Sequence, residues 1–452
     1  MRKQERRASI CLLLAFILLL GTGVFTYRYF REGAKWAGFY GNTQIFTDGR
    51  INRGTVTDRH DEMLLHCSPD GLEYSGDWTT RVSTIHAVGD VNGNIASGAI
   101  NMFASQLIGY DILNGTYDTS ANGKTIQLTI DAGANRAAYN ALNGRTGTVG
   151  VYNWKTGEIM CMVSTPAFDP YEEVAEDNEE AIYFNNFLSG TMTPGSTFKL
   201  VTAASVIDNL SDRDDFHFEC DGINQYGDDE DTQFRCVYEH GDVDFRGALA
   251  VSCNGAFGEL SRELGGKALQ KTTKEVGLTE PLEFDGIETA AGSFKFPTDD
   301  DIRLSWAGIG QSQDLVNPCA MMVYMGAIAN DGEAVQPTLI KSTSFIDEIR
   351  GAKTIGRYLE SSTAAELKDM MKNNVVENYG EDNFPGMDIY AKSGSAETGG
   401  ADSDAWFVGF TGDEEAPYAF VVWIKEGGAG ASDAAPVARQ VLESLQAGNY
   451  YE

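Results

Sequence analysis

The sequence predicts an α+β protein that begins with a single membrane-spanning helix. One apolar stretch near the N-terminus, residues 9–27, has no charged residue and is long enough to cross a bilayer. In the second half of the chain, short strand-like segments occur in pairs around polar turns. Other segments carry the apolar spacing of amphipathic helices. Together these patterns indicate an antiparallel sheet flanked by helices.

The charge pattern around the apolar stretch predicts its orientation. Four basic residues precede it, and such residues stay on the cytoplasmic side of a membrane. A cleavable signal peptide is the alternative, but no convincing small-residue cleavage site precedes Tyr27. We therefore expect residues 1–31 to form a cytoplasmic tail and an uncut anchor. The rest of the chain would then lie outside the cytoplasm.

The remaining length, about 420 residues, is sufficient for more than one domain. We expect a small membrane-proximal domain over residues 32–125 and a larger domain over residues 126–452. In the larger domain the predicted hairpins join 147–152 to 159–164 and 407–411 to 418–424, and the predicted helices cover 364–374 and 434–445.

Three short motifs follow one another along the larger domain. They are Ser196-Thr197-Phe198-Lys199, Ser252-Cys253-Asn254 and Lys392-Ser393-Gly394-Ser395. Each alone is short enough to occur by chance in a chain of this length. Their order, their wide spacing and their flanking residues make the set informative, because together they supply a nucleophile, bases and a cation for an anionic group.

The residues around Ser196 predict how it becomes reactive. A turn at 193–195 precedes it and an apolar stretch follows, which places the serine at a helix N-terminus. There the helix dipole and a free backbone N–H would favour an oxyanion. Lys199 at i+3 shares its face. A lysine can act as the base only if burial or another cation lowers its pKa, and Lys392 is the candidate second cation.

These motifs resemble those of class B penicillin-binding proteins, the monofunctional peptidoglycan D,D-transpeptidases, in their compact, short-pedestal form. The resemblance implies a penicillin-binding, serine β-lactamase-like fold in which an antiparallel sheet is flanked by helices and residues 32–125 form the pedestal. Further family-like stretches lie at 53–59, 128–131, 147–149, 154–159, 163–170, 310–312, 317–318, 329–332 and 405–410.

The resemblance also implies a role for each motif residue. Ser196 would be acylated by the penultimate D-alanine of a peptidoglycan stem peptide, and an amine of another stem would then accept the acyl group. Lys199 would deprotonate Ser196. Ser252 would pass a proton to the departing amine. Asn254 would hold the donor amide and orient Lys199.

The third motif would bind the substrate carboxylate, which is also the carboxylate of a β-lactam. Lys392 and the hydroxyls of Ser393 and Ser395 would contact it, and Gly394 would let the backbone approach. The backbone N–H groups of Ser196 and Ser395 would form the oxyanion hole. No cofactor is implied. Serine stands at 393, where threonine is commoner in the family, and keeps the hydroxyl.

Several alternatives remain open at this point. A D,D-carboxypeptidase would use water as the acceptor, a β-lactam sensor or β-lactamase would also be acylated, and a non-catalytic cell-wall scaffold could keep the fold. Class B proteins commonly act with a glycosyltransferase of the SEDS family, so residues 32–125 would either dock such a partner or only space the larger domain from the membrane. The net charge of −32 argues against nucleic acid as a partner.

The cysteines and histidines allow three states near residue 220. Cys220 and Cys236 could form a disulfide, since oxidation is allowed outside the cytoplasm. Together with His217 and His240 they also have a plausible zinc spacing, although we expect no metal. His240 could instead only hold a loop. Cys253 is interpreted as a small apolar filler, and His60, His66 and His86 as surface residues.

Overall fold

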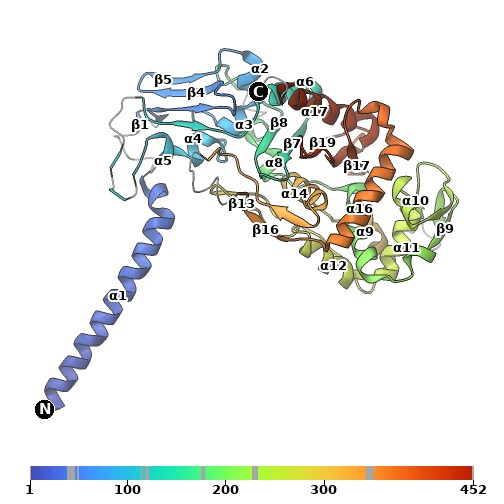
Figure 1. The fold of residues 1–452 in the computed structure, drawn as a ribbon, viewed down its shortest axis with the longest axis horizontal. Helices are drawn as coiled ribbons and strands as arrows, with labels where there is room; N and C mark the ends of the chain where they lie inside the picture. The colour runs from blue at the N-terminus through green and yellow to red at the C-terminus, as the bar shows by residue number, and fades with distance from the viewer. Residues whose placement is uncertain are drawn as a thin grey trace.

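The computed structural model describes residues 2–37, 46–47, 50–111, 113–114, 116–117, 122–174, 179–225, 233–342 and 351–449. Helix α1 (Arg2–Ala37) projects away from the body of the protein (Figure 1). Its segment Gln4–Gly33 is long and apolar enough to cross a membrane, and the body of the protein covers none of its most apolar window. This agrees with the predicted N-terminal helix.

The part of the chain after α1 forms a small sheet with four strands in the order β5-β4-β3-β6. The strands are β3 (Gly54–Thr57), β4 (Met63–Ser68), β5 (Gly71–Tyr74) and β6 (Thr125–Gln127). A hairpin of β1 (Phe46–Thr47) and β2 (Arg50–Ile51) precedes them, and the short helices α2 (Trp78–Ser83), α3 (Ile85–Val88), α4 (Ala99–Met102) and α5 (Ala104–Leu107) connect β5 to β6. Strand β6 runs parallel to β3 and spans the proposed domain boundary at 125, which stays a prediction.

The larger sheet is antiparallel, with five strands in the order β17-β18-β19-β7-β8. Its strands are β7 (Gly147–Asn153), β8 (Ile159–Thr165), β17 (Ile389–Ala396), β18 (Asp404–Thr411) and β19 (Tyr418–Ile424). Both predicted hairpins are present, as β7 with β8 and as β18 with β19. The predicted α+β class is confirmed, and β17, which carries Lys392, is an edge strand.

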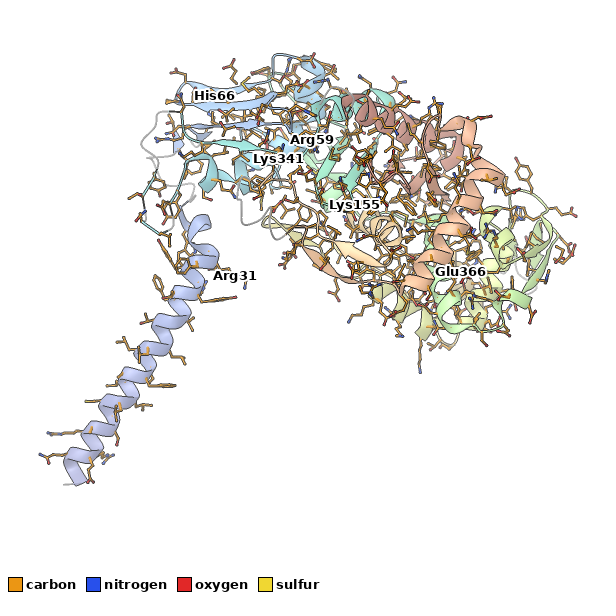
Figure 2. All side chains as sticks on the ribbon, in the orientation of Figure 1. Arg31, Arg59, His66, Lys155, Lys341 and Glu366 are labelled. Carbon is orange, nitrogen blue, oxygen red and sulfur yellow. The ribbon has the colours of Figure 1, made fainter. Side chains whose placement is uncertain are left out.

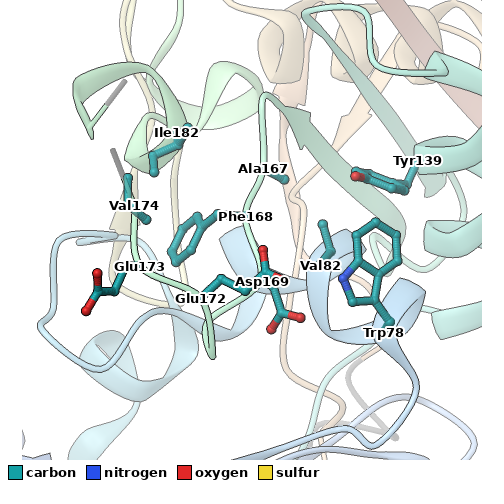
Figure 3. Close-up of a pocket in the computed structure, with 10 residues that line it drawn as sticks. All are labelled: Trp78, Val82, Tyr139, Ala167, Phe168, Asp169, Glu172, Glu173, Val174 and Ile182. Atoms are coloured by element: carbon teal, nitrogen blue, oxygen red, sulfur yellow. The ribbon is translucent and has the colours of Figure 1, made fainter. Parts of the chain in front are cut away.

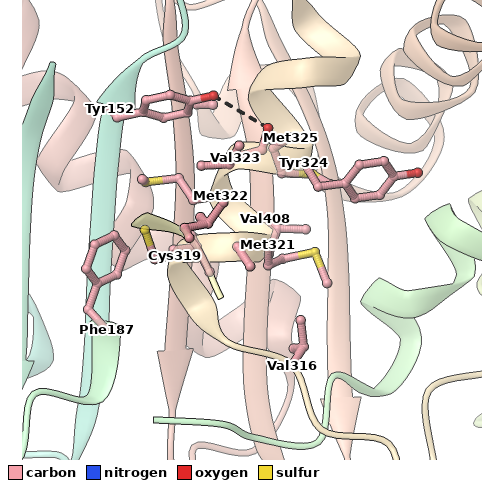
Figure 4. Close-up of a cluster of buried hydrophobic side chains, with 14 of the residues drawn as sticks. Tyr152, Phe187, Val316, Cys319, Met321, Met322, Val323, Tyr324, Met325 and Val408 are labelled. Atoms are coloured by element: carbon pink, nitrogen blue, oxygen red, sulfur yellow. Dashed lines mark hydrogen bonds between the residues drawn. The ribbon is translucent and has the colours of Figure 1, made fainter. Parts of the chain in front are cut away.

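Helices cover both faces of this sheet. On one face lies α14 (Pro318–Ala329), which is apolar all round and fully buried, so its side chains fill the space between the sheet and the other helices. Figure 4 shows Met322 and Val323 of α14 beside Tyr152 of β7, whose hydroxyl donates to the Val323 carbonyl at 3.5 Å. On the other face α6 (Ala132–Leu142) packs against α17 (Ala435–Asn449).

The remaining helices gather around α9 (Lys199–Asn209), which packs against three of them. They are α10 (Phe245–Ala250), α11 (Asn254–Leu264), α12 (Gly266–Glu275), α13 (Asp301–Gly308) and α16 (Ser361–Asn374). Short connecting elements are α7 (Glu179–Tyr183), α8 (Asn186–Ser189), β13 (Glu283–Phe284), β14 (Ile287–Glu288), β15 (Glu333–Val335) and β16 (Thr354–Arg357). The predicted helices at 364–374 and 434–445 correspond to α16 and α17.

A small lobe lies at the end of the body farthest from α1 (Figure 1). It consists of two antiparallel strand pairs, β9 (His217–Cys220) with β12 (Gly241–Asp244), and β10 (Ile223–Gln225) with β11 (Gln233–Arg235). Such two-stranded pairs are marginally stable alone, so the lobe depends on what it packs against.

Ion pairs join the small sheet to the larger one. Arg59 lies between the two (Figure 2), where its Nη2 is 3.4 Å from Glu158 Oε2. Arg81 on α2 binds Asp169 with two hydrogen bonds, of 2.8 and 2.6 Å, and these lower the pKa of the Asp169 carboxyl. Figure 3 shows a pocket at this junction, lined by residues of α2, α6 and the segment 167–174. The pocket contains no residue of the three motifs.

The assignment of His86 to the surface was wrong. His86 belongs to α3 and is only 1% exposed. Its Nε2 lies 2.8 Å from the carbonyl oxygen of Ile182. Burial lowers its pKa to about 4, so the imidazole is neutral and serves as a hydrogen-bonding core residue.

Candidate active site

Ser196 lies in a 3₁₀ turn, η2 (Gly195–Phe198), that runs directly into α9. The predicted helix N-terminus is therefore present. Gly195 has φ +53°, and a Cβ placed on it would lie 2.7 Å from the Ser395 carbonyl oxygen. Glycine at this position lets the turn lie directly against β17, which brings the first motif next to the third.

Lys199 points from the first turn of α9 into the protein and is 0% exposed. Its Nζ lies 3.0 Å from Ser196 Oγ, 2.7 Å from the Ser252 carbonyl oxygen and 2.7 Å from Asn254 Oδ1. The last two atoms can only accept hydrogen bonds, so they take two N–H groups of the amine. In the neutral amine the remaining position is a lone pair available to the Ser196 hydroxyl proton.

The buried position changes the acidity of both motif lysines. Burial lowers the pKa of Lys199 to about 8, which leaves roughly a tenth of the amine neutral at pH 7. Burial and the nearby Lys199 lower the pKa of Lys392 well below its ordinary value. Two positive charges in one buried site would repel each other, and this favours the neutral form of a lysine. The neutral form is the one that can act as a base.

The second motif lies between the two lysines. Ser252 has φ +56°, a strained backbone geometry for a residue with a side chain, and its Oγ lies 3.1 Å from Lys199 Nζ and 2.9 Å from Lys392 Nζ. Asn254 begins α11, and its Nδ2 donates to the Arg235 carbonyl at 2.7 Å, which fixes Oδ1 toward Lys199. The second motif therefore connects the first to the third.

The third motif occupies the edge strand β17. Lys392 Nζ also donates to the Ser393 carbonyl at 2.9 Å, while Ser395 is exposed and Ser393 half-buried. A Cβ on Gly394 would lie 2.9 Å from Thr197 Cγ2, so glycine permits the close approach of β17 to the turn. The strand thus carries a buried amine and two hydroxyls within four consecutive residues, a set of groups suited to a carboxylate.

Tyr379 is a site residue that the sequence analysis missed. Its hydroxyl accepts a hydrogen bond from the Ser393 backbone N–H at 2.8 Å and lies 3.0 Å from Ser393 Oγ. It ends the π-helix η5 (Val375–Tyr379) and belongs to no motif, so no sequence signal marked it.

The structure brings together every predicted residue of the three motifs, but it changes the picture around residue 220. In the structure Cys220 and Cys236 are free thiols, and a disulfide between them stays a prediction. His217 is exposed and lies 3.2 Å from Asp242 Oδ1. Cys253 takes the place that the sequence suggested for His217, since its sulfur lies near the other three side chains. The interpretation of Cys253 as a small apolar filler therefore does not describe all of its surroundings.

The chain is similar in sequence to known peptidoglycan transpeptidases. Residues 147–443 match the penicillin binding protein transpeptidase domain. Peptidoglycan D,D-transpeptidase PbpA of Mycobacterium tuberculosis is 28% identical over 372 residues, 75% of this chain and 74% of that protein. PbpA of Mycolicibacterium smegmatis is 24% identical over 98% of both chains.

Solved structures show the same fold. The ceftriaxone acyl-enzyme complex of penicillin-binding protein A from M. tuberculosis superposes with a TM-score of 0.71 at 23% identity, covering 87% of this chain and 98% of that one.

Proposed function

From the premise that the chain belongs to the penicillin-binding protein transpeptidase family, we propose that it is a peptidoglycan D,D-transpeptidase acting through an acyl-enzyme on Ser196. The observation that carries the proposal is the 3.0 Å contact between Ser196 Oγ and the buried Lys199 Nζ, whose pKa is lowered to about 8. A poor nucleophile is thus paired with a base that can be neutral near physiological pH.

In the acylation step, neutral Lys199 takes the Ser196 proton while Oγ attacks the carbonyl carbon of the penultimate D-alanine. The carbonyl electron pair moves to oxygen, where the backbone N–H groups of Ser196 and Ser395 stabilise the negative charge. The carbonyl then re-forms as the C–N bond breaks, with the electron pair of that bond going to nitrogen. Ser252 Oγ, which contacts both lysines, passes its proton to that nitrogen and takes the former Ser196 proton from Lys199, so D-alanine leaves and Lys199 is neutral again.

In the second step, the amine of another stem peptide attacks the acyl-enzyme ester. Lys199 accepts a proton from that amine and returns one to Ser196 Oγ as the ester bond breaks. One peptide bond is broken and one is formed, so the reaction needs no cofactor and no external energy source. Asn254 holds the donor amide through the second N–H of its Nδ2, since the first N–H donates to the Arg235 carbonyl and Oδ1 accepts from Lys199.

Substrate recognition in this proposal depends on the terminal carboxylate. Lys392, with the hydroxyls of Ser393 and Ser395, binds it, and the arriving anion favours the charged form of Lys392. A β-lactam presents an equivalent carboxylate beside a reactive amide, so we propose that β-lactams acylate Ser196. Acyl-enzyme complexes of the M. tuberculosis relative with β-lactams support this.

The direct test supplies a pentapeptide donor ending in D-alanyl-D-alanine together with a D-amino acid as acceptor amine. We expect release of D-alanine and formation of the exchanged peptide, both lost in Ser196→Ala. A product consisting only of the shortened, hydrolysed peptide would indicate a carboxypeptidase. Release of neither product, with no acyl-enzyme, would favour a scaffold.

The apolar helix α1 supports a proposed location as well. We propose that it contains an uncut, single-pass anchor in a bacterial cell membrane, with residues 32–452 outside the cytoplasm. Protease added to intact protoplasts should then degrade the body of the protein, and complete protection would contradict this topology.

The anchor and the membrane-proximal region also lead us to propose a membrane partner, a glycosyltransferase of the SEDS family. Co-purification from detergent-solubilised membranes should recover such a protein with the wild-type chain. A control variant exchanges α1 for an unrelated membrane helix and has a redesigned exposed surface over 50–111. If this variant recovers the same amount of the glycosyltransferase, the proposed docking is contradicted.

A further inference from the structure

Four side chains that could bind a metal ion converge behind the second motif. Their donor atoms all lie within 4.8 Å of one another, and we refer to them as the Cys3His cluster: Cys220, Cys236, His240 and Cys253. Cys220 and Cys253 are fully buried, and the other two are half-buried. Buried thiols gathered around one imidazole nitrogen are the donor set of structural zinc sites.

The spacing of the donor atoms fits a tetrahedral zinc ion. Zinc–ligand bonds of about 2.3 Å to sulfur and about 2.0 Å to nitrogen give edges of about 3.8 Å between two sulfurs and about 3.5 Å between sulfur and nitrogen. Cys236 Sγ and Cys253 Sγ are 3.8 Å apart, and Cys220 Sγ is 3.4 Å from His240 Nδ1. A disulfide would need about 2.0 Å and would use only two of the four donors.

The surrounding backbone favours thiolates, the form in which cysteine binds metals. Asn254 donates its backbone N–H to Cys236 Sγ at 3.2 Å, and Ala256 donates to Cys253 Sγ at 3.5 Å. Both N–H groups belong to the first turn of α11, whose dipole stabilises negative charge. Such N–H contacts to sulfur are typical outer interactions of a metal site.

The small lobe has a structural need for such a site. Cys220 ends β9, and His240 immediately precedes β12, the partner strand, while Cys236 directly follows β11. The described part of the lobe is built from two-stranded pairs, which do not hold together by themselves. A metal bound by these three residues and by Cys253 would join both strand pairs to α11.

We propose that the Cys3His cluster binds one structural Zn²⁺ through three thiolates and one imidazole nitrogen. Binding releases the protons of the three thiols, and the ion joins the lobe to the second motif. The site stands independently of the proposed transpeptidase activity, since it depends only on the four donors.

The site also acts on Asn254, which it holds at two points. The Asn254 backbone N–H donates to the sulfur of Cys236, the proposed zinc ligand. The Asn254 side-chain amide donates at 2.7 Å to the carbonyl of Arg235, the residue directly before Cys236. Oδ1 then accepts from Lys199 at 2.7 Å. The zinc ion is therefore a positioning element for the lysine base, an effect that rests on the proposed function.

The test measures zinc in the full-length protein, purified in detergent without chelators from cells grown with added zinc. We expect about one zinc ion per chain, as for a single four-ligand site. The variants Cys220→Ser and His240→Ala should lose it. The matched control His217→Ala, on the exposed side of the same lobe, should keep it.

A second measurement does not depend on variants that fold. Wild-type protein depleted of zinc and refilled with Co²⁺ should show the thiolate-to-cobalt charge-transfer absorption and the intense visible bands of a tetrahedral site. Absence of both zinc and the cobalt spectrum would overturn the proposal. So would a disulfide between any two cluster cysteines in non-reducing peptide mapping of freshly purified protein.

The effect on the base has its own readout. Removal of zinc should slow acylation of Ser196 by benzylpenicillin on the order of tenfold, and zinc added back should restore the rate. An unchanged acylation rate after zinc removal would contradict the positioning effect. The zinc site itself would still be tested by the measured metal content. If acylation is absent in every preparation, the proposed function fails and the zinc measurement still stands.

Discussion

The side-chain amines of Lys199 and Lys392 contact the same oxygen, Ser252 Oγ, at 3.1 and 2.9 Å. Both lysines are 0% exposed, and both have lowered pKa values. Lys199 is surrounded by acceptors and by the Ser196 hydroxyl, whereas Lys392 lies beside the hydroxyl-bearing edge strand. This difference supports the proposed roles of Lys199 as the base and of Lys392 as the amine that binds an anionic substrate group.

The first prediction concerns pH. Protonated Lys199 cannot accept the Ser196 proton, so acylation by benzylpenicillin should rise with pH and level off above about pH 8, the lowered pKa of Lys199. Quenched-flow mass spectrometry at a series of pH values measures the rate. A rate that is constant from about pH 6 to pH 9, on either side of that pKa, would contradict the role of Lys199.

The second prediction concerns Asn254, whose Oδ1 lies 2.7 Å from Lys199 Nζ. Asn254→Asp keeps the shape and adds a negative charge, which favours the protonated lysine. The midpoint of the acylation pH profile should move upward by about 1 to 3 units, the usual effect of an opposite charge at this distance. Asn254→Ala is the control, since it lowers the rate without adding charge. An unmoved midpoint in Asn254→Asp would count against this electrostatic coupling.

The third prediction concerns Tyr379, a positioning residue. Tyr379→Phe leaves the Ser393 backbone N–H without its 2.8 Å acceptor, which should cost about 1 to 3 kcal/mol of stability. Since we propose that the third motif binds the carboxylate, the loss in acylation should appear mainly as weaker substrate binding, with a smaller change in the rate at saturation. Thermal unfolding and saturation kinetics measure the two effects. A lower acylation rate at saturating substrate, with unchanged substrate binding, would instead place Tyr379 in the chemical step.

The fourth prediction concerns the contact behind the nucleophile. Gly310 has φ +76°, and a Cβ on it would lie 2.2 Å from the Gly195 carbonyl oxygen. Gly310→Ala should destabilise the protein by about 1 to 3 kcal/mol and displace the turn that carries Ser196, with loss of acylation. Gly356→Ala is the matched control, because a Cβ there meets nothing within 4 Å. Equal behaviour of the two variants would show that the turn tolerates the added methyl group.

The sequence was sufficient for the elements that depend on local pattern. The turn at Pro194-Gly195, the largely apolar runs of β7 and β8, and the lysine at i+3 from Ser196 are all local signals, and the structure has the corresponding elements. The three motifs could be assigned to one site because their combination is specific.

Residues that act through long-range contacts could not be found this way. Tyr379 reaches Ser393 from a separate helix, and His86 bonds to the carbonyl of Ile182 in α7, far along the chain. Cys253 joins Cys220 only because β9 folds against the start of α11. No local periodicity encodes such contacts, since they depend on how distant elements pack.

The measurement that tests the central claim most directly is intact-mass spectrometry of the full-length protein incubated with benzylpenicillin. Wild type and the control Ser211→Ala, an exposed serine in a turn, should gain the mass of one penicilloyl group, and peptide mapping should place it on Ser196. Ser196→Ala should gain none. An adduct that persists in Ser196→Ala, or that maps to another residue, would contradict the assignment of the nucleophile.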